Sequence, residues 1–335
     1  MGRRKLTDEV PELIGKSRKI TQIRNAIEKI AKIDSPLLLF GETGTGKERI
    51  AGLIHSKSTR SEENFVSFNC LAYSKDILET SLFGEDTQKG EIDNAFNGTL
   101  FINNIEELSH EAQSILLSII ERKKFKRINS RKTIDCDIRL LGGTTKNVDE
   151  LKQNYKFNQD LLFSLSRIFL NIPPLRERKE DIPVLIQHFV KNFSKEFGIE
   201  IPVLSSNFVE MAMKPSWVGN VYQLESCIRT ALILSQEKEL DLMDLPVEIF
   251  KSEPDFILNV YNLIKTNVKN FKQAINEIEA KIINIALMEN NYNQYATAMA
   301  LGLKEPTIRE KMVRFGIKSS RQRLWEKRKR KRTKK

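Results

Sequence analysis

The first half of the chain alternates between helical and extended patterns of apolar residues. Apolar side chains at Ile20, Ile23, Ile27, Ile30 and Ala31 recur every three or four residues, which predicts an amphipathic helix over 20–33. Strands are predicted at "PLLLF", "NFVSFN", "TLFIN" and "DIRLLGGT", with helices from about Lys47, near "SKDILETSLF" and within "SHEAQSILLSIIERKKF". This alternation is typical of an α/β fold, a parallel sheet with flanking helices.

The second half is predicted to be helical. The prolines of "NIPPLRERKEDIP" interrupt the alternation, and from Ile182 to about Ser235 every apolar period is helical. Residues 251–270 carry weaker signals and are interpreted as a linker. A final helical block extends from Phe271 to Ile317. We therefore expect a small helical domain after the α/β domain, and a separate all-α domain after the linker.

Positive charge is concentrated at the end of the chain. Residues 318–335 hold eleven Lys or Arg and one Glu, a net charge of +10 out of +11 for the whole chain, which leaves +1 for residues 1–317. So dense a run of like charge is expected to be disordered and to attract the phosphate backbone of nucleic acids. A tail that is merely solvated is the alternative.

Composition excludes several classes of protein. The longest apolar stretches, such as "SPLLLF" and "SILLSII", are shorter than a membrane span, and no apolar region follows the basic start of the chain. Cys70, Cys136 and Cys227 are widely spaced, and the three histidines are scattered. The spacing therefore predicts buried thiols, no disulfide framework and no metal site. A soluble, cytoplasmic protein without a membrane partner is expected.

A glycine-rich loop carries the strongest chemical signal. "GETGTGKE" follows an apolar strand and opens a predicted helix, which is the setting of a phosphate-binding loop. Backbone N–H groups, the helix N-terminus and Lys47 would bind the phosphates of a nucleotide. Glu48 stands where Ser or Thr would offer magnesium a hydroxyl. The predicted nucleotide-binding residues are Gly41, Glu42, Thr43, Gly44, Thr45, Gly46, Lys47 and Glu48.

A helix-turn-helix is predicted over 291–317. Ala298 is small where two helices would cross, Gly302 would make the turn, and Ile308, Met312 and Phe315 would face the core. Asn293 is expected to cap the first helix, and Pro306 fits the start of a recognition helix over 305–315. The candidate DNA-binding residues are Lys304, Glu305, Thr307, Arg309, Lys311 and Arg314. An ordinary helical hairpin is the alternative.

The preceding helix is predicted to carry an apolar stripe. It comprises Phe271, Ile275, Ile278, Ile282, Ile285 and Leu287 or Met288. Two interpretations are open, a dimer contact between two chains or packing within one chain.

Several stretches together resemble the AAA+ ATPase domain of the sigma-54-dependent transcriptional activators, the bacterial enhancer-binding proteins. They are "ELIGKSRKI", "GETGTGKERIA", "FVSFNCLA", "ETSLFG", "GTLFINNIEEL", "IPPLRERKEDIPVL" and "WVGNVYQLES". The resemblance covers residues 12–250, and the final block resembles the family's Fis-like helix-turn-helix. It implies an AAA+ P-loop NTPase with a helical lid, and Glu48 after the lysine is usual in the family. No receiver or sensor domain is expected before the ATPase.

The resemblance implies these domains: an N-terminal tail (1–11), an AAA+ α/β nucleotide-binding domain (12–172), a helical lid (173–250), a linker (251–270), a Fis-like helix-turn-helix domain (271–317) and a basic disordered tail (318–335).

The chain departs from the family where hydrolysis is concerned. The Walker B strand tip, Asp-Glu in the family, is here Asn103 and Asn104, and an amide neither accepts a proton nor brings charge to magnesium. The positions that match the family's arginine fingers are Asn158 and Ser164, and Tyr222 stands at the lid arginine. At the first sensor, Thr145 replaces an expected Asn, whereas Asn69, which positions the catalytic carboxylate in the family, is retained.

A family loop is also missing. The family's G-A-F-T-G-A loop, which touches the sigma factor, is replaced by the shorter "EDTQKGEIDNAFN".

These residues predict a DNA-binding regulator that binds ATP or ADP, with magnesium bound weakly or not at all. We expect weak or no ATP hydrolysis and no remodelling of sigma-54. No catalytic residue and no metal ligand are predicted. Double-stranded DNA and other copies of the chain are the expected partners, with RNA polymerase holoenzyme as a further candidate. One alternative is an active ATPase that remodels a sigma factor or another partner and uses Glu106 or Glu107 as a displaced carboxylate. Another is an architectural nucleic-acid binder.

Overall fold

A computed structural model describes residues 12–86, 88–235, 239–241, 244–245, 270–290 and 292–317. The chain divides into two compact units, Met1–Val203 with Val209–Glu239, and Leu204–Phe208 with Leu240–Lys335, and each is described by itself. The predicted N-terminal tail (1–11), nearly all of the predicted linker (251–270) and the basic tail (318–335) lie outside the described residues.

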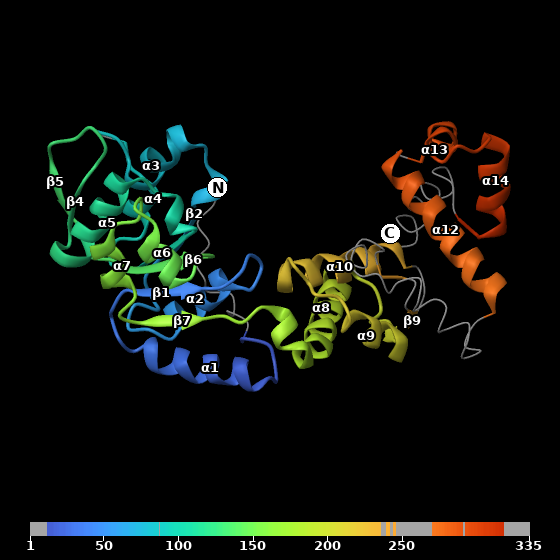
Figure 1. Ribbon diagram of the computed structural model, residues 1–335, viewed down its shortest axis with the longest axis horizontal. Helices are drawn as coiled ribbons and strands as arrows, with labels where there is room; N and C mark the ends of the chain where they lie inside the picture. Colours follow the sequence, from blue (N-terminus) through green and yellow to red (C-terminus); the bar gives the residue numbers. More distant parts are fainter. Residues whose placement is uncertain are drawn as a thin grey trace, which may run out of the picture. The chain divides into compact units, whose positions relative to one another are not determined.

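A five-stranded parallel sheet forms the centre of the first unit, as the alternating pattern predicts (Figure 1). Its strand order is β2-β3-β6-β1-β7, and every neighbouring pair is parallel. The strands are β1 (Leu37–Phe40), β2 (Phe65–Asn69), β3 (Thr99–Asn103), β6 (Arg139–Thr144) and β7 (Phe169–Asn171). Edge strand β7 was not predicted, because its apolar run is only the three residues 168–170 and only Leu170 of the strand is buried.

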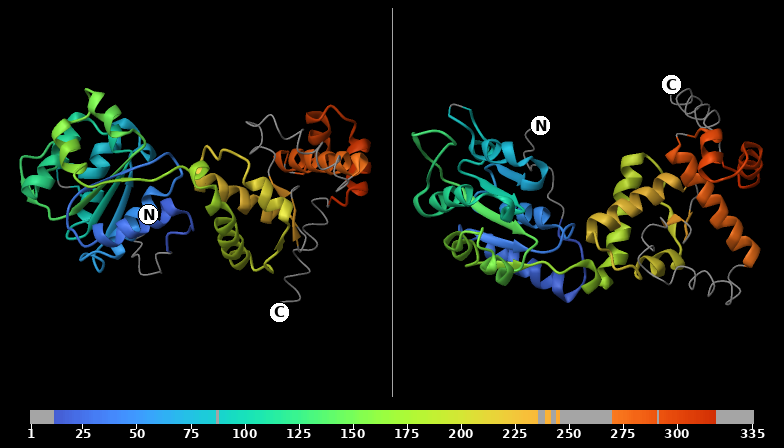
Figure 2. Two further views of the ribbon diagram at one scale, coloured as in Figure 1. Left: turned by 60° about the horizontal axis from the view of Figure 1, so that its bottom comes forward. Right: turned by 45° about the horizontal axis from the view of Figure 1, so that its top comes forward.

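Helices cover both faces of the sheet (Figures 1 and 2). On β1, Leu37 and Leu39 belong to one apolar cluster and Leu38 to another, because successive strand residues point to opposite faces. The first cluster packs under α1 and α2, and the second under α3, α5 and α7. The helices of this part are α1 (Arg18–Ile30), α2 (Lys47–Ser56), α3 (Lys75–Phe83), α4 (Glu91–Asn94), α5 (His110–Arg122), α6 (Val148–Gln153) and α7 (Gln159–Leu165).

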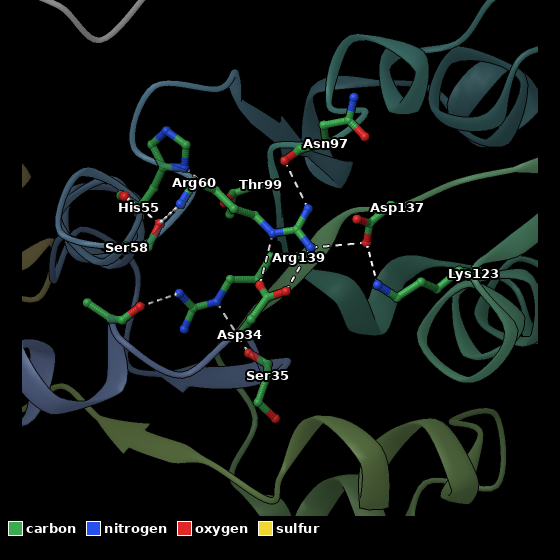
Figure 3. A network of polar contacts seen from close by, with 11 residues as sticks. Asp34, Ser35, His55, Ser58, Arg60, Asn97, Thr99, Lys123, Asp137 and Arg139 are labelled. Atoms are coloured by element: carbon green, nitrogen blue, oxygen red, sulfur yellow. Dashed lines mark hydrogen bonds and ion pairs between the residues drawn. The ribbon is translucent and has the colours of Figure 1, made fainter.

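Polar contacts fix the edge of the sheet where the strands begin (Figure 3). Arg60 donates to both carboxylate oxygens of Asp34, at 2.9 and 2.7 Å, and to Asp137 at 3.0 Å. The guanidinium of Arg139, the first residue of β6, donates to carbonyl oxygens at the end of α1 and just before β1, those of Ile30, Ala31 and Ser35. This network lies at the opposite edge from the glycine-rich loop, which follows the carboxyl end of β1.

The predicted helical region after the sheet contains α8 (Ile182–Phe197), α9 (Ser206–Ala212) and α10 (Asn220–Leu234). Pro183 lies in the first turn of α8, where its missing N–H costs nothing, and Gly198 ends that helix with φ +65°. Short extended segments that the sequence did not predict are β4 (Lys124–Lys126), β5 (Thr133–Asp135), β8 (Val203–Leu204) and β9 (Glu239–Leu240).

The second unit holds three helices of the final block: α12 (Phe271–Glu289), α13 (Gln294–Ala300) and α14 (Glu305–Arg314). Asn293 caps α13 through a hydrogen bond from Ala296 N, Pro306 lies in the first turn of α14, and Gly302 turns the chain between them with φ +64°. Their shared core consists of Ile283, Leu287, Ala298, Ile308 and Met312, with Phe315 packed against it.

Only part of the expected stripe on α12 packs within this chain, and the side chains of Ile285 and Met288 lie outside the described part of the structure. Phe271 is 67% exposed, Ile275 45% and Ile282 48%, whereas Ile283 and Leu287 are buried. The helix is therefore apolar on two faces, and one of them is left uncovered in the described structure.

No helix among the described residues is long and apolar enough to cross a membrane. The three cysteines, Cys70, Cys136 and Cys227, are buried, as predicted. Burial raises the pKa of both the Cys70 and the Cys136 thiol to about 12, so neither is a reactive thiolate at neutral pH.

Candidate nucleotide and DNA sites

The glycine-rich loop connects β1 to α2 at the carboxyl edge of the sheet. Gly44 and Gly46 take positive φ values of +76° and +99°, the region that glycine adopts without strain. No side chain caps the first turn of α2, so its N–H groups are free of a capping acceptor. The loop and the helix start together present backbone N–H groups in the arrangement by which proteins bind anions.

Lys47 is the first residue of α2, and its ammonium group lies against the loop. Its Nζ donates to Gly41 O at 2.7 Å and to Glu42 O at 3.2 Å. Burial lowers the pKa of Lys47, and the carboxylate of Glu106 partly offsets that effect. An anionic phosphate would favour the charged ammonium in the same way. Glu48, in contrast, is exposed on the outer side of the first turn.

Asn220, the first residue of α10, ties the helical region to the loop. Its Nδ2 donates to Thr43 O at 2.9 Å and to Glu42 Oε2 at 3.2 Å, while its Oδ1 accepts from Leu175 N at 2.7 Å. The residue is fully buried and has φ +53°. The backbone N of Tyr222 donates to Gly44 O at 3.2 Å, whereas the Tyr222 side chain is 69% exposed. At the lid position expected for an arginine, the hydrogen bond to the loop therefore comes from the backbone of Tyr222.

Two arginines of "PLRERKEDI" also hold the loop, and the sequence had not singled them out. Arg176 pairs with Glu42 at 2.5 and 2.7 Å, and its hydrogen bonds are the main reason that the pKa of Glu42 is lowered. Arg178 is buried and donates to Thr45 O at 3.3 Å. The only signal was their position in a stretch that matches the family, because both contacts join residues far apart in the sequence.

The two amides lie where β3 ends, as expected. Asn103 is paired in register with Gly143 of β6 and with Asn69 of β2. Asn104 is 8% exposed and adopts the left-handed region with φ +57°. The Asn69 side chain accepts from Leu71 N at 3.2 Å. Neither amide can act as a general base, so this strand tip brings no proton acceptor to the loop.

Glu106 lies beside this strand tip. Its Oε1 accepts from both the backbone N and the Oγ1 of Thr145, each at 3.1 Å. The first-sensor position Thr145 therefore fixes a carboxylate next to the loop, whereas Glu107 is exposed.

The positions of the arginine fingers have structural uses in this chain. Asn158 caps α7 by accepting from Leu161 N at 3.0 Å, and Ser164 is buried. Arg167, two residues after α7, is exposed and stacks over Phe163, with 5.5 Å from its guanidinium carbon to the ring centre. No arginine occupies either finger position.

The short segment between α3 and β3 is tied down by a buried ion pair. Arg127 donates to both oxygens of Asp93, each at 2.6 Å, and to Gln88 O at 3.3 Å. The side chains of Arg127 and Asp93 are only 10% and 8% exposed. The described part of this segment is thus held against the hairpin of β4 and β5.

The candidate DNA-binding residues lie on and before α14, but they are not equivalent. Lys304, Arg309 and Arg314 are exposed, whereas Glu305 and Thr307 are partly buried. Lys311 differs from the expectation of an outward-facing side chain, because it pairs with Glu279 of α12. Arg314 donates to Asn276 of the same helix at 3.2 Å.

The comparisons with known proteins agree with this geometry. A sigma-54 interaction domain matches residues 13–171, and an AAA+ ATPase lid domain matches residues 176–256. The chain is 30% identical over 311 residues to the transcriptional regulatory protein ZraR of Salmonella typhimurium, which covers 90% of this chain and 68% of ZraR. It is 31% identical over 314 residues to the nitrogen fixation protein VnfA of Azotobacter vinelandii, covering 91% of this chain but 59% of VnfA. The chain spans similar or smaller shares of several other relatives.

Solved structures show the same fold. The structure of NtrX from Brucella abortus in complex with ATP covers 94% of this chain and 72% of that chain, with a TM-score of 0.70 and 25% identity. The corresponding complex with ADP has a TM-score of 0.69 and 24% identity. The sheet, the loop and the helical lid are those of an AAA+ P-loop NTPase, and the chain belongs to the family of sigma-54-dependent transcriptional activators.

Proposed function

We propose that the protein is a DNA-binding transcriptional regulator that binds ATP or ADP and hydrolyses ATP weakly or not at all. One observation carries this proposal: a complete phosphate-binding loop ending at Lys47 stands beside a strand tip whose two residues, Asn103 and Asn104, are amides. Nucleotide then acts as a ligand that stabilises one arrangement of loop and lid, and its hydrolysis does not drive work.

Nucleotide binding is supported by the loop itself. The positive φ values of Gly44 and Gly46, the uncapped start of α2 and the buried Lys47 together form an anion site. The structure of the NtrX relative in complex with ATP supports the same ligand class. Adenine nucleotides are therefore the cofactors we propose.

Poor hydrolysis is supported by several independent losses. The strand tip offers no base, Asn158 and Ser164 are used inside the chain, and the side chain of Tyr222 is exposed. An arginine finger alone is worth roughly 10³ to 10⁵ in rate. Loss of both fingers and the base is expected to leave turnover near background.

The proposal excludes sigma-54 remodelling. The segment that replaces the family's contact loop is short, and the Asp93–Arg127 pair holds its described part against the domain. The protein would then influence RNA polymerase holoenzyme by occupying DNA and not by contacting it through this loop.

DNA binding is assigned to α13 and α14. Their turn at Gly302 and the exposed Lys304, Arg309 and Arg314 fit a helix-turn-helix that contacts bases and phosphates. Lys311 contributes less to DNA binding than the other cations, because its ammonium group is paired with Glu279. The uncovered apolar stripe of α12, Phe271, Ile275 and Ile282, supports a dimer of two chains.

The experiment combines binding and turnover on one sample of the full chain. A fluorescent ATP analogue is titrated, and phosphate release is followed with and without target DNA. We expect saturable binding that Lys47→Ala abolishes, together with turnover no greater than that of Lys47→Ala. Turnover well above background that Lys47→Ala removes would overturn the proposal, and failure to bind nucleotide would favour an architectural nucleic-acid binder.

DNA recognition is tested separately. Arg309→Ala is expected to weaken binding to the target and to relax its sequence preference, while deletion of 318–335 is expected to weaken binding to all DNA alike. A complete loss of DNA binding on deletion of 318–335, with no residual sequence preference, would show that α13 and α14 are not the reader.

The second candidate is an active ATPase with a displaced carboxylate. It is favoured by the position of Glu106, which Thr145 holds beside the phosphate-binding loop. If phosphate release is found, a Glu106→Gln, Glu107→Gln double variant should abolish it. Phosphate release that persists in the double variant would show that neither glutamate replaces the missing carboxylate of the strand tip.

A further inference from the structure

Two oxygen atoms at the carboxyl edge of the sheet are left without donors. Asn103 Oδ1 and Glu106 Oε2 are both buried, and neither accepts a hydrogen bond from any described residue. A buried acceptor without a partner costs roughly 1 to 3 kcal/mol, more if it is charged. Such atoms are uncommon, and a pair of them next to a candidate ligand site calls for a physical account.

Both atoms lie along the end of β6. Asn103 is in register with Gly143, and its Oδ1 is 2.9 Å from the place of a β-carbon on that glycine. Two residues further along, Thr145 fixes the other oxygen of Glu106 through its backbone N and its hydroxyl. Glycine at 143 therefore leaves the room that the amide oxygen occupies.

The end of β6 is also where the phosphate-binding loop begins. β1 lies beside β6, and Gly41, the first residue of the loop, donates its N–H to Thr144 O at 3.2 Å. The charge of Glu106 acts on Lys47, whose pKa it raises against the effect of burial. The two unpartnered oxygens and the lysine thus belong to segments that follow the carboxyl ends of β3 and β1, the two strands on either side of β6.

The chemistry of this set fits a divalent cation. Magnesium prefers oxygen ligands and is commonly held by one or two carboxylates together with the phosphates of a nucleotide. In the described part of the chain, no group of three or more His, Cys, Asp or Glu residues could hold a metal by itself. The protein oxygens are therefore too few for a closed site, and the phosphates must complete it.

We propose that Glu106 and Asn103 hold the magnesium ion of the bound nucleotide, with Glu106 supplying the carboxylate that the strand tip lacks. The proposal rests on the proposed binding of nucleotide at the loop. It adds that this binding uses magnesium and that Glu106 is the main protein ligand of the metal. Glu106 then serves binding alone, because a carboxylate that ligates the metal is not a free base for water. The exposed neighbour Glu107 has no part in the site.

The opposing account makes Glu106 only a counter-charge for Lys47. In that case its carboxylate would repel phosphates with or without metal, and removing it would tighten nucleotide binding equally in both conditions. A metal ligand behaves differently, because its removal weakens binding only when magnesium is present. The dependence of nucleotide affinity on magnesium therefore separates the two roles.

The test titrates a fluorescent ADP analogue into the full chain in excess magnesium and in EDTA. For the wild type we expect magnesium to tighten binding about tenfold, an ordinary coupling between two ligands. Glu106→Gln should reduce this coupling to less than about twofold, since it removes the one charged ligand of the proposed site and leaves two neutral amides. The matched control Glu107→Gln should keep the wild-type coupling.

Asn103→Asp is a second variant, for which we expect a gain in magnesium coupling instead of a loss. It adds a carboxylate beside the metal and should raise the coupling several-fold above that of the wild type. Thermal unfolding without nucleotide checks that all variants are folded. The same titrations with Mn²⁺, followed by its electron paramagnetic resonance signal, report the metal directly and should show ADP-dependent binding that Glu106→Gln removes.

The outcomes separate the two proposals. Nucleotide binding with the same magnesium coupling in the wild type, Glu106→Gln and Asn103→Asp would overturn the metal site and leave nucleotide binding intact. Tighter nucleotide binding by Glu106→Gln, both in magnesium and in EDTA, would establish the counter-charge role of Glu106 and would also overturn the metal site. No binding by the wild type in either condition would overturn both proposals.

Discussion

The carbonyl oxygen of Gly219 lies 2.2 Å from the position that a β-carbon on Gly44 would occupy. The loop and the start of α10 are therefore in backbone contact, and the Tyr222 N to Gly44 O and Asn220 Nδ2 to Thr43 O hydrogen bonds depend on that closeness. A side chain at this one position of the loop would force the lid away.

Gly44→Ala is expected to destabilise the nucleotide-free protein by about 1 to 3 kcal/mol more than Gly46→Ala. Both glycines have positive φ values, so both variants carry backbone strain, but nothing lies within 4 Å of a β-carbon on Gly46. Denaturant unfolding measures the difference, and hydrogen exchange at the Tyr222 amide locates it. Equal losses from the two variants would show that the contact with Gly219 adds nothing.

The buried Asp93–Arg127 pair gives a second prediction. Asp93→Ala should cost about 3 kcal/mol, because it leaves the guanidinium of Arg127 buried without its counter-charge. Arg127→Lys should also destabilise, since an ammonium group cannot reproduce two parallel hydrogen bonds. Denaturant unfolding measures the stability of both variants. Asp149→Ala, which removes the exposed ion pair of Asp149 with Lys152, is the control and should change stability by less than about 0.5 kcal/mol.

An apolar replacement of both partners sharpens that test. The Asp93→Leu, Arg127→Met double variant should be more stable than Asp93→Ala alone, because it buries no unpaired charge. A double variant that loses the sum of the two single losses would contradict this account.

Local patterns predicted four of the five strands of the parallel sheet, the glycine-rich loop and the cap at Asn293, because each depends on residues close in sequence. Strand β3 has the predicted bounds Thr99–Asn103, and Asn293 caps α13 as expected. The contacts of Asn220 and Arg176 with the loop could not be predicted, since they join segments that only the tertiary fold brings together. They are nevertheless what shapes the candidate site.

Helix α12 shows the limit of periodicity in another way. It has apolar residues on two faces, so the 3.6-residue period fits both the exposed Phe271, Ile275 and Ile282 and the buried Ile283 and Leu287. Which face packs within the chain is decided by α13 and α14, and the pattern of α12 alone holds no information about them.

The Arg60 network at the opposite edge of the sheet gives a third prediction (Figure 3). Arg60→Leu should cost about 1 kcal/mol, because Arg60 is mostly buried while its partners Asp34 and Asp137 are 44% exposed and screened by solvent. Nucleotide affinity should not change, because the loop lies at the other edge. Lys124→Met, which removes an exposed pair with Asp135, is the control and should cost less.

The same network has a pH dependence of known sign. Hydrogen bonds from Lys123 and Arg60 lower the pKa of Asp137 below its ordinary value of 3.8. The stability that this carboxylate contributes is therefore present above about pH 4 and is lost as the pH falls through its folded pKa. Arg60→Leu should flatten the acid limb of a stability profile measured by urea unfolding below pH 4. An acid limb as steep as that of the wild type would show that Arg60 does not act on Asp137.

His55 gives the fourth prediction, in a different pH range. The ring is buried in α2, with Nδ1 2.9 Å from Thr99 Oγ1. Burial lowers its pKa from the ordinary value of 6.5, and the charge of Arg139 lowers it further, against a backbone hydrogen bond with Glu63 that raises it. The folded protein therefore holds a neutral imidazole where the unfolded chain already binds a proton.

The sign of the effect follows from that difference in proton binding. Stability is full above about pH 6.5 and falls as the pH drops from there to the folded pKa, because protons favour the unfolded chain over this interval. His55→Gln should lower stability at pH 7.5 by about 1 to 2 kcal/mol, since the replacement packs less well, and should flatten the profile below pH 6.5.

The exposed His110, at the start of α5, provides the matched control for the replacement of a histidine by glutamine. Burial also lowers the pKa of His188, so a small slope should remain in His55→Gln and disappear when His188→Gln is added. Urea unfolding at half-unit steps from pH 8 to 4.5 measures all four proteins. A slope in His55→Gln equal to that of the wild type would mean that the buried imidazole is protonated in the folded state, with an acceptor other than Thr99 stabilising the charge.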